Sequence, residues 1–209
     1  MMTKKLSGTS DAVLKNMLKA HGCPLGLHEV RMRILGHLIA PEPGVSPIAA
    51  VQGLWGGQLP EVDDIDELNE ILDMLMTGIW NPLALQVRVR RDRIKLATPP
   101  VGKDVKALGL LALLRAQELQ SFEEGLLGGA QFVDIPQPAA KSMSTLGEMA
   151  VLFASVHNTI KSGAYGTAKD AKGLRANVDE LNKIAEMELN SVIDACLVNL
   201  PDSGGTSVH

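Results

Sequence analysis

Apolar residues recur every three or four positions along most of the chain, which is the spacing of amphipathic helices. The clearest stripe covers 65–79, and Asp64 and Glu67 at its start have the spacing of a capping box. Proline, glycine and capping residues bound the other stripes. We expect further helices at 11–20, 27–40, 47–55, 104–119, 139–160 and 170–200. These patterns predict an all-α fold, an orthogonal bundle of roughly seven to nine helices.

Two stretches depart from helical spacing. In 86–96 valine alternates with arginine, so a small hairpin or an irregular arm competes with helix there. The stretch 122–138 is rich in glycine and proline, which predicts turns rather than a continuous helix. The ends of the helices on either side of these two stretches therefore depend on packing that the pattern does not show.

The stretch 99–102, with two prolines and a glycine, is the best candidate for a boundary within the chain. It divides an N-terminal helical half, 1–98, from a C-terminal helical half, 99–200. We expect the two halves to form one compact domain, although the same stretch would also suit a linker between two domains. After Pro201 the residues 201–209 are expected to form a disordered tail.

Several glycines stand where helix is predicted. Gly36 lies inside the helix 27–40, where a glycine costs about 1 kcal/mol relative to alanine. Its presence predicts that another backbone packs closely against it. Gly125, Gly128 and Gly129 resemble a phosphate-binding loop only superficially, because they follow a helix rather than a strand and no lysine follows them. Close helix packing is the better interpretation of these glycines.

Charge and cysteine content limit the classes of partner and the cellular compartment that we expect for the protein. The formal net charge of -4 gives no general attraction to nucleic acid or anionic membranes. Cys23 and Cys196 are too few for a disulfide framework and fit a reducing compartment. The N-terminus lacks the apolar stretch of a secretory signal, and the most apolar run, Val105–Leu114, is too short to span a bilayer. We therefore predict a cytoplasmic protein that does not enter membranes.

No recognisable motif for catalysis or cofactor binding occurs, so we assign no catalytic residue, cofactor or metal. His21, Cys23 and His28 place three potential ligands close together in sequence, but their spacing is not that of a zinc site. An enzyme or small-ligand site could still be assembled from dispersed polar residues, for example His37, Glu124 and His157.

A concentrated basic stretch lies in 88–95, where Asp92 interrupts five cationic residues: Arg88, Arg90, Arg91, Arg93 and Lys95. They could make weak contacts with nucleic acid, but no aromatic side chain lies among them to stack on bases. A solvated arm that contacts a protein partner or forms internal ion pairs is the preferred interpretation.

The two tryptophans, Trp55 and Trp80, stand at the ends of predicted helices near glycine or proline. This position favours structural anchors over ligand stacking, although either could lie at an interface. The candidate interaction residues are therefore Arg88, Arg90, Arg91, Arg93, Trp55 and Trp80.

Four landmarks follow one another between residues 27 and 153. They are the helix 27–40 leading into Pro41, the segment Leu54-Trp55-Gly56-Gly57, the helix 65–84 with Asn81, and the segment Ser121-Phe122-Glu123-Glu124-Gly125-Leu126-Leu127-Gly128-Gly129. In order and spacing they resemble the YecA/YgfB-like family of uncharacterised bacterial proteins. The resemblance implies an all-helical fold but no particular activity, because the family has no established catalytic residues. It does not extend to the C-terminal metal-binding module of some members, since Cys196 and His209 alone would supply ligands there.

The last predicted helix, 170–200, is longer than the usual helix of a globular protein, and its apolar face could pack on a second copy. We therefore expect a helical protein-interaction or regulatory module without catalysis, which acts as a homodimer on a protein partner that the sequence does not identify. The dispersed-residue site is the first alternative to this hypothesis. Weak nucleic-acid contact through 88–95 is the second.

Overall fold

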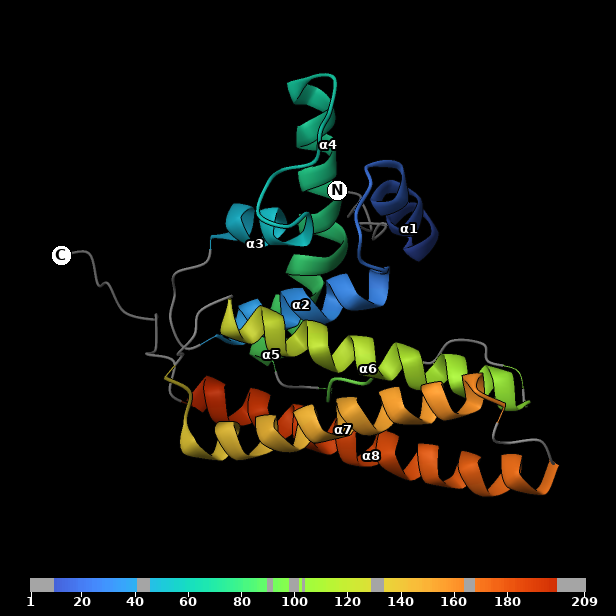
Figure 1. Ribbon diagram of the computed structural model, residues 1–209. Helices are drawn as coiled ribbons and strands as arrows, with labels where there is room; N and C mark the ends of the chain where they lie inside the picture. Colours follow the sequence, from blue (N-terminus) through green and yellow to red (C-terminus); the bar gives the residue numbers. More distant parts are fainter. Residues whose placement is uncertain are drawn as a thin grey trace, which may run out of the picture.

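The computed structural model describes residues 10–40, 46–89, 92–97, 102, 104–128, 134–163 and 168–198, except for the side chains of 168–171. Within these residues the chain is all-α, with eight α-helices, one π-helical turn and no strand (Figure 1). The helices are α1 (Asp11–Ala20), α2 (Leu27–Ile39), α3 (Pro47–Leu54), α4 (Ile65–Leu75), α5 (Asn81–Val89), α6 (Val105–Leu127), α7 (Gln137–Lys161) and α8 (Ala168–Val198). The predicted fold class is confirmed. The tail 201–209 and most of the candidate boundary 99–102 lie outside the described residues.

The helices form a layer with a second group standing on it. Helices α6, α7 and α8 lie side by side and alternate in direction, and α2 packs against α6 (Figure 1). Helix α4 stands nearly upright on this layer, with α1 and α3 beside it. Buried apolar residues form two clusters, and α2 contributes Leu35 to one and Ile34 to the other. Helix α2 therefore joins the two groups. No described helix is both long and apolar enough to cross a membrane.

Side-chain caps determine where four helices begin. The hydroxyls of Ser10 and Ser46 and the carboxylates of Asp64 and Asp104 each accept a hydrogen bond from the backbone N–H three residues later, at 2.7–3.4 Å. All four residues stand where the sequence predicts the start of a helix. The predicted starts of α1, α3, α4 and α6 are therefore confirmed.

Helical backbone is continuous from α4 into α5. Met76–Trp80 forms the π-helical turn, and Asn81, which the sequence marks as a new start, keeps right-handed helical dihedral angles (φ −62°, ψ −43°). Pro82 follows directly and has no N–H to donate to the preceding turn. The wider π-helical turn before it accommodates this missing hydrogen bond. The chain therefore runs as one helical stretch from Ile65 to Val89.

The hairpin considered for 86–96 is wrong for the part of it that the structure describes. Residues 86–89 complete α5, and 92–97 form a non-helical segment, while 90 and 91 lie outside the described residues. The in-and-out alternation is nevertheless real, because Ile94 and Leu96 are buried whereas Arg93 and Lys95 are exposed. This segment pairs with side chains of neighbouring helices instead of with a second strand.

The prediction of turns in 122–138 is wrong at its beginning. Helix α6 continues to Leu127, well past the expected end near residue 119, and Gly128 terminates it in the left-handed conformation (φ 57°, ψ 21°). The local penalty of a glycine inside this helix is outweighed because α2 packs directly on it. Residues 134–136 are non-helical, and 129–133 lie outside the described residues.

Helices α2 and α6 approach each other so closely that their backbones touch at two glycines. A Cβ atom built on Gly125 would lie 2.0 Å from the carbonyl oxygen of Arg33, and one on Gly36 would lie 2.4 Å from that of Phe122. No real side chain fits at such distances. The prediction that a backbone packs against Gly36 is confirmed, and close helix packing is confirmed as the role of Gly125.

Candidate binding groove

The basic stretch 88–95 does not form one continuous patch in the part that the structure describes. Arg88 is exposed at the end of α5, whereas Arg93 lies on the segment 92–97, 3.6 Å from the carboxylate of Asp194 on α8. Arg90 and Arg91 lie outside the described residues. Arg88 is therefore separated from Arg93, which forms an exposed ion pair with α8.

Both tryptophans are half-buried against the apolar cluster of α1–α4. The indole N–H of Trp55 donates to the carbonyl oxygen of His21 at 2.7 Å, which ties the end of α3 to the end of α1. A ring whose polar edge is satisfied internally is an anchor of the fold. Trp55 therefore acts as a structural anchor, and Trp80 packs on the same cluster.

His37, Glu124 and His157 are not brought together. Glu124 forms an ion pair with Arg33, and burial, together with the charge of Arg33, lowers the pKa of His37. The Nδ1 atom of His157 lies 2.9 Å from the carbonyl oxygen of Gly109. Gly109 and Glu124 are separated by about 22 Å along α6, given the rise per residue of a helix. The three side chains therefore cannot act on one substrate atom.

His21, Cys23 and His28 also face different partners. The Nδ1 atom of His21 lies 3.8 Å from Glu67, the thiol of Cys23 donates to the carbonyl oxygen of Leu54 at 3.7 Å, and Nε2 of His28 lies 3.8 Å from Glu29. Among the described residues no three histidine, cysteine or acidic side chains are grouped to hold a metal ion.

A groove of about 600 Å³ opens between α1, α2, α5, α6 and the segment 92–97. Its wall is mainly apolar and is formed by Leu27, Met32, Leu35, Leu83, Ile94 and Leu114, while His28, Gln86 and Glu118 add polar groups to the lining. Its rim is cationic, with Lys15 from α1, Arg31 from α2, and Arg93 and Lys95 from the segment 92–97. The sequence indicates Arg93 as an interaction residue but not the groove, because the lining comes from five separate stretches of the chain.

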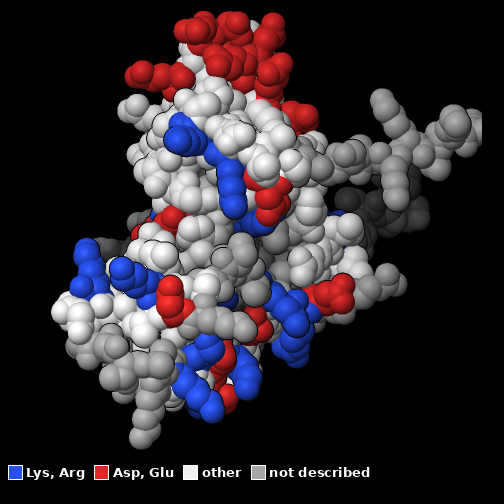
Figure 2. Space-filling model, turned by 90° about the vertical axis from the view of Figure 1, so that its right-hand side faces the viewer, with Lys and Arg blue, Asp and Glu red and all other residues white. Residues whose placement is uncertain are grey.

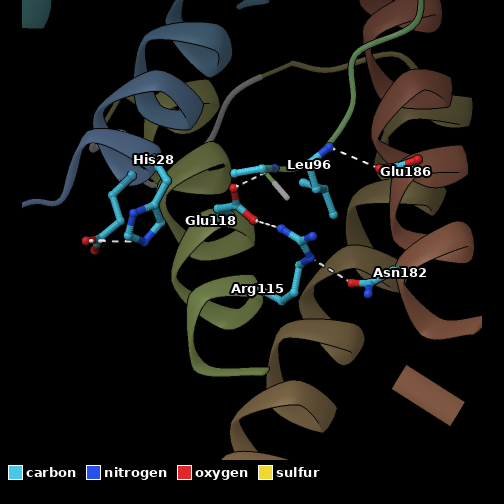
Figure 3. A network of polar contacts seen from close by, with 8 residues as sticks. His28, Leu96, Arg115, Glu118, Asn182 and Glu186 are labelled. Carbon is cyan, nitrogen blue, oxygen red and sulfur yellow. Dashed lines mark hydrogen bonds and ion pairs between the residues drawn. The ribbon is translucent and has the colours of Figure 1, made fainter. Parts of the chain in front are cut away.

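Three side chains from α6 and α8 hold the segment 92–97 in place, and Figure 3 shows two of them, Glu118 and Glu186. The side-chain amide of Asn190 accepts from the N–H of Ile94 and donates to its carbonyl oxygen, both at 2.9 Å. Glu186 accepts from the N–H of Leu96 at 3.1 Å. Glu118 accepts from the N–H of Ala97 at 3.1 Å. These bonds replace a partner strand and fix the wall of the groove that this segment forms.

Glu118 is the buried acid of the groove, and Arg115 lies one helical turn before it. Glu118 and Arg115 are 1% and 4% exposed and form a direct ion pair, while Nε of Arg115 donates to Asn182 at 2.7 Å (Figure 3). Burial raises the pKa of Glu118 above its usual value, and the charge and hydrogen bond of Arg115 oppose this change. Each carboxylate oxygen already accepts a hydrogen bond, so Glu118 is built to hold the fold rather than to move protons.

The rim of the groove carries more positive than negative charge. Asp11 receives two hydrogen bonds from Arg31, at 2.7 and 3.1 Å, and these bonds lower its pKa, with the charges of Arg31 and Lys15 acting in the same direction. Lys95 has no ion-pair partner among the described residues.

Comparison with protein-family models, curated proteins and solved structures found no match to the chain.

A second hollow, of about 310 Å³, adjoins the groove and shares Lys15, Leu27 and His28 with it. It extends the lining to Lys19, one turn further along α1, and to Cys23. Together the two hollows form an elongated surface along α1 and α2 with cations spaced along it.

The second cysteine, Cys196, is fully buried on α8, and burial raises the pKa of its thiol from 9.0 to about 11. This change lowers the thiolate fraction about 100-fold at a given pH near neutrality, because the thiolate population falls tenfold for each pKa unit. In a Cys23→Ser variant we expect the native protein to react with Ellman's reagent at least that much more slowly than the urea-unfolded protein. Equal rates in the two states would show that Cys196 is accessible in the native protein.

Proposed function

We propose that this protein is a non-catalytic interaction module and that its groove binds an acidic, amphipathic segment of a protein partner. The observation that carries the proposal is the combination of a mainly apolar wall with a rim of four cations. Two of them are paired, Arg31 with Asp11 and Arg93 with Asp194, whereas Lys15 and Lys95 have no ion-pair partner among the described residues. A segment with apolar residues on one side and carboxylates on the other complements both features.

The charge of the groove opposes that of the whole chain. The protein carries a formal net charge of -4, yet the groove presents its cations together, with Asp11 and the buried Glu118 as its only acidic lining residues among those described. Such a local field attracts acidic partners and repels basic ones, including at a distance comparable to the screening length of about 8 Å in physiological salt.

The dimensions favour a polypeptide over a compact small molecule. The groove of about 600 Å³ continues into the second hollow along α1 and α2, so the surface is longer than a single enclosed pocket. Both acids that line the groove are already engaged, Asp11 by Arg31 and Glu118 by Arg115 and the N–H of Ala97. The described lining thus supports binding, and it offers no pair of side chains arranged as nucleophile and base.

The proposal predicts the composition of peptides selected from a random display library on the immobilised full-length protein. We expect selected peptides to combine Asp or Glu with apolar residues and to bind the Lys15→Glu/Lys95→Glu variant at least about 10-fold more weakly, since each close charge contact contributes on the order of 1.4 kcal/mol or more. The Lys106→Glu/Lys141→Glu variant is the matched control, because both lysines are exposed near helix N-termini and neither lines the groove. Selection of basic peptides, or equal binding to all three proteins, would refute the proposal.

The proposal includes a cytoplasmic setting and membership of the YecA/YgfB-like family. The first is supported by two free cysteines, one of them fully buried. The second is supported by the order of the four landmarks, two of which coincide with the end of α3 and with the α6 residues that contact α2. An all-helical interaction module agrees with both.

A further inference from the structure

The start of α4 and the residues before it form an acidic tip, defined here as residues 61–70. It contains six carboxylates in ten positions, and no lysine or arginine occurs between Arg33 and Arg88. Figure 2 shows acidic side chains covering the top of the molecule, while lysines and arginines lie lower on the same face. Without these six carboxylates the remainder of the chain would carry a net positive charge. Charge is therefore segregated between the tip and the rest of the molecule.

Most of the tip is not neutralised by its own chain. Asp64 caps α4, and Glu67 accepts from the N–H of Asp63 and lies 3.8 Å from His21. The other acids of the tip have no ion-pair partner among the described residues, and they are Glu61, Asp63, Asp66 and Glu70. Carboxylates held this close together repel one another, and binding to cations relieves that repulsion.

The tip also presents an apolar side chain. Ile65, the first residue of α4, is 65% exposed and stands between Asp64 and Asp66. The tip thus combines carboxylates with an exposed apolar residue, which is the chemistry that the groove is proposed to bind.

We infer that the segment bound in the groove is the acidic tip of a second copy of this chain, an inference that rests on the proposed function of the groove. The carboxylates of Asp63 and Asp66 face the cations Lys15 and Lys95, and Ile65 packs on the apolar wall. Complementarity of charge and of apolar surface therefore identifies a partner that the sequence itself supplies.

The tip cannot fill the groove of its own chain. Asp11, at the start of α1, lines the groove, whereas His21, just after the end of α1, contacts Glu67 of the tip. The groove thus lies along the first half of this ten-residue helix and the tip beyond its other end, so that Lys15 and Asp11 of the groove are about 9 and 15 Å from His21 along the helix axis. Two copies related by a twofold axis, with their α1 helices antiparallel, place each tip opposite the groove of the other copy. The contact then forms twice and closes as a dimer.

Charge reversal tests this arrangement in the full-length chain. The groove variant is Lys15→Glu/Lys95→Glu, and the tip variant is Asp63→Lys/Asp66→Lys. Light scattering after size exclusion should give twice the chain mass for the wild type and the chain mass for each variant, with a dimer dissociation constant raised at least about 100-fold by two repulsive contacts. An equimolar mixture of the two variants should form a heterodimer. In it the acidic tip of the groove variant binds the unaltered groove of the tip variant, and the basic tip of the tip variant binds the acidic groove of the groove variant.

The outcomes separate this inference from the proposed function. A dimer that forms in the mixture, but in neither variant by itself, supports the tip-and-groove contact. Circular dichroism establishes that both variants remain helical. A monomeric wild type, or a dimer that survives both variants, overturns the inference. Peptide selection then still decides whether the groove binds acidic segments of other proteins. The Lys106→Glu/Lys141→Glu variant should dimerise as the wild type does, and its dissociation would point to a general effect of charge and overturn the inference.

Discussion

Replacing Gly125 with alanine is expected to lower the free energy of unfolding by about 3 kcal/mol or more. The new Cβ atom would lie 2.0 Å from the carbonyl oxygen of Arg33, 2.8 Å from its carbonyl carbon and 2.9 Å from its Cα. All three are backbone atoms of α2, so no side-chain rotation can relieve the contact. Helices α2 and α6 would have to move apart, and the buried residues on both sides of the crossing would lose packing.

Gly147 provides a matched control, because it also lies inside a long helix but has no atom within 4 Å of an added Cβ. Gly147→Ala should stabilise the protein by up to about 1 kcal/mol, the difference in helix propensity. Urea unfolding followed by circular dichroism at 222 nm measures both variants against the wild type. Similar stability of the Gly125→Ala and Gly147→Ala proteins would show that α2 and α6 are not in backbone contact at this position.

The capping residues and the glycine in α2 could be predicted from sequence because their causes are local. Ser10, Ser46 and Asp64 each cap a helix through a bond to a residue three positions away, so the whole interaction lies within one short window. Gly36 has a penalty in a helix that only a close neighbour explains. The sequence did not show that this neighbour is the α6 backbone from Phe122 to Leu126, nor that α6 would extend that far, because this depends on a contact between residues almost ninety positions apart.

The segment 92–97 shows how a correct pattern can predict the wrong partner. Alternation of apolar and cationic residues normally indicates a half-buried strand, and Ile94 and Leu96 are indeed buried on one side. Its hydrogen bonds, however, go to Asn190 and Glu186 of α8, nearly one hundred positions away. A side-chain amide can bond to backbone N–H and C=O groups as a neighbouring strand does. No local sequence pattern predicts which distant side chain will do so.

The groove could not be predicted from sequence for a similar reason. In their own helices and loops Lys15 and Lys95 are exposed cations and Arg31 is a half-buried one, and they share a role only because α1, α2 and the segment 92–97 surround one hollow. Arg93 was among the predicted interaction residues. In the fold, however, it lies with Lys15, Arg31 and Lys95 at the groove, and Arg88, its predicted neighbour, does not line the groove. The acids of the tip, by contrast, are neighbours in sequence, so the composition of 61–70 already shows them.

Replacing Arg115 with methionine is expected to lower the free energy of unfolding by about 3–5 kcal/mol at pH 7, the usual effect of removing one partner from a buried ion pair. The carboxylate of Glu118, which is buried in the wild type, would keep only the hydrogen bond from the N–H of Ala97. Loss of that arrangement would also loosen the segment 92–97 and the wall of the groove. The double variant Arg115→Met/Glu118→Leu should recover much of the lost stability, because it replaces the pair with apolar side chains and leaves no buried charge.

Acidification should reduce the defect of the Arg115→Met variant. Burial raises the pKa of Glu118 in the folded protein, and the charge and hydrogen bond of Arg115, which oppose this change, are absent in the variant. A carboxyl group whose pKa is higher in the folded than in the unfolded state takes up its proton more readily when folded, so stability falls as the pH rises from 4.5 through the folded pKa. Urea unfolding of the variant and the wild type should therefore show a smaller difference at pH 5 than at pH 7. The result would mean that Glu118 does not depend on Arg115 for its charge in either of two cases. One is an equal loss of unfolding free energy in the Arg115→Met variant at pH 5 and pH 7. The other is a loss in the double variant equal to the sum of the losses in the Arg115→Met and Glu118→Leu single variants.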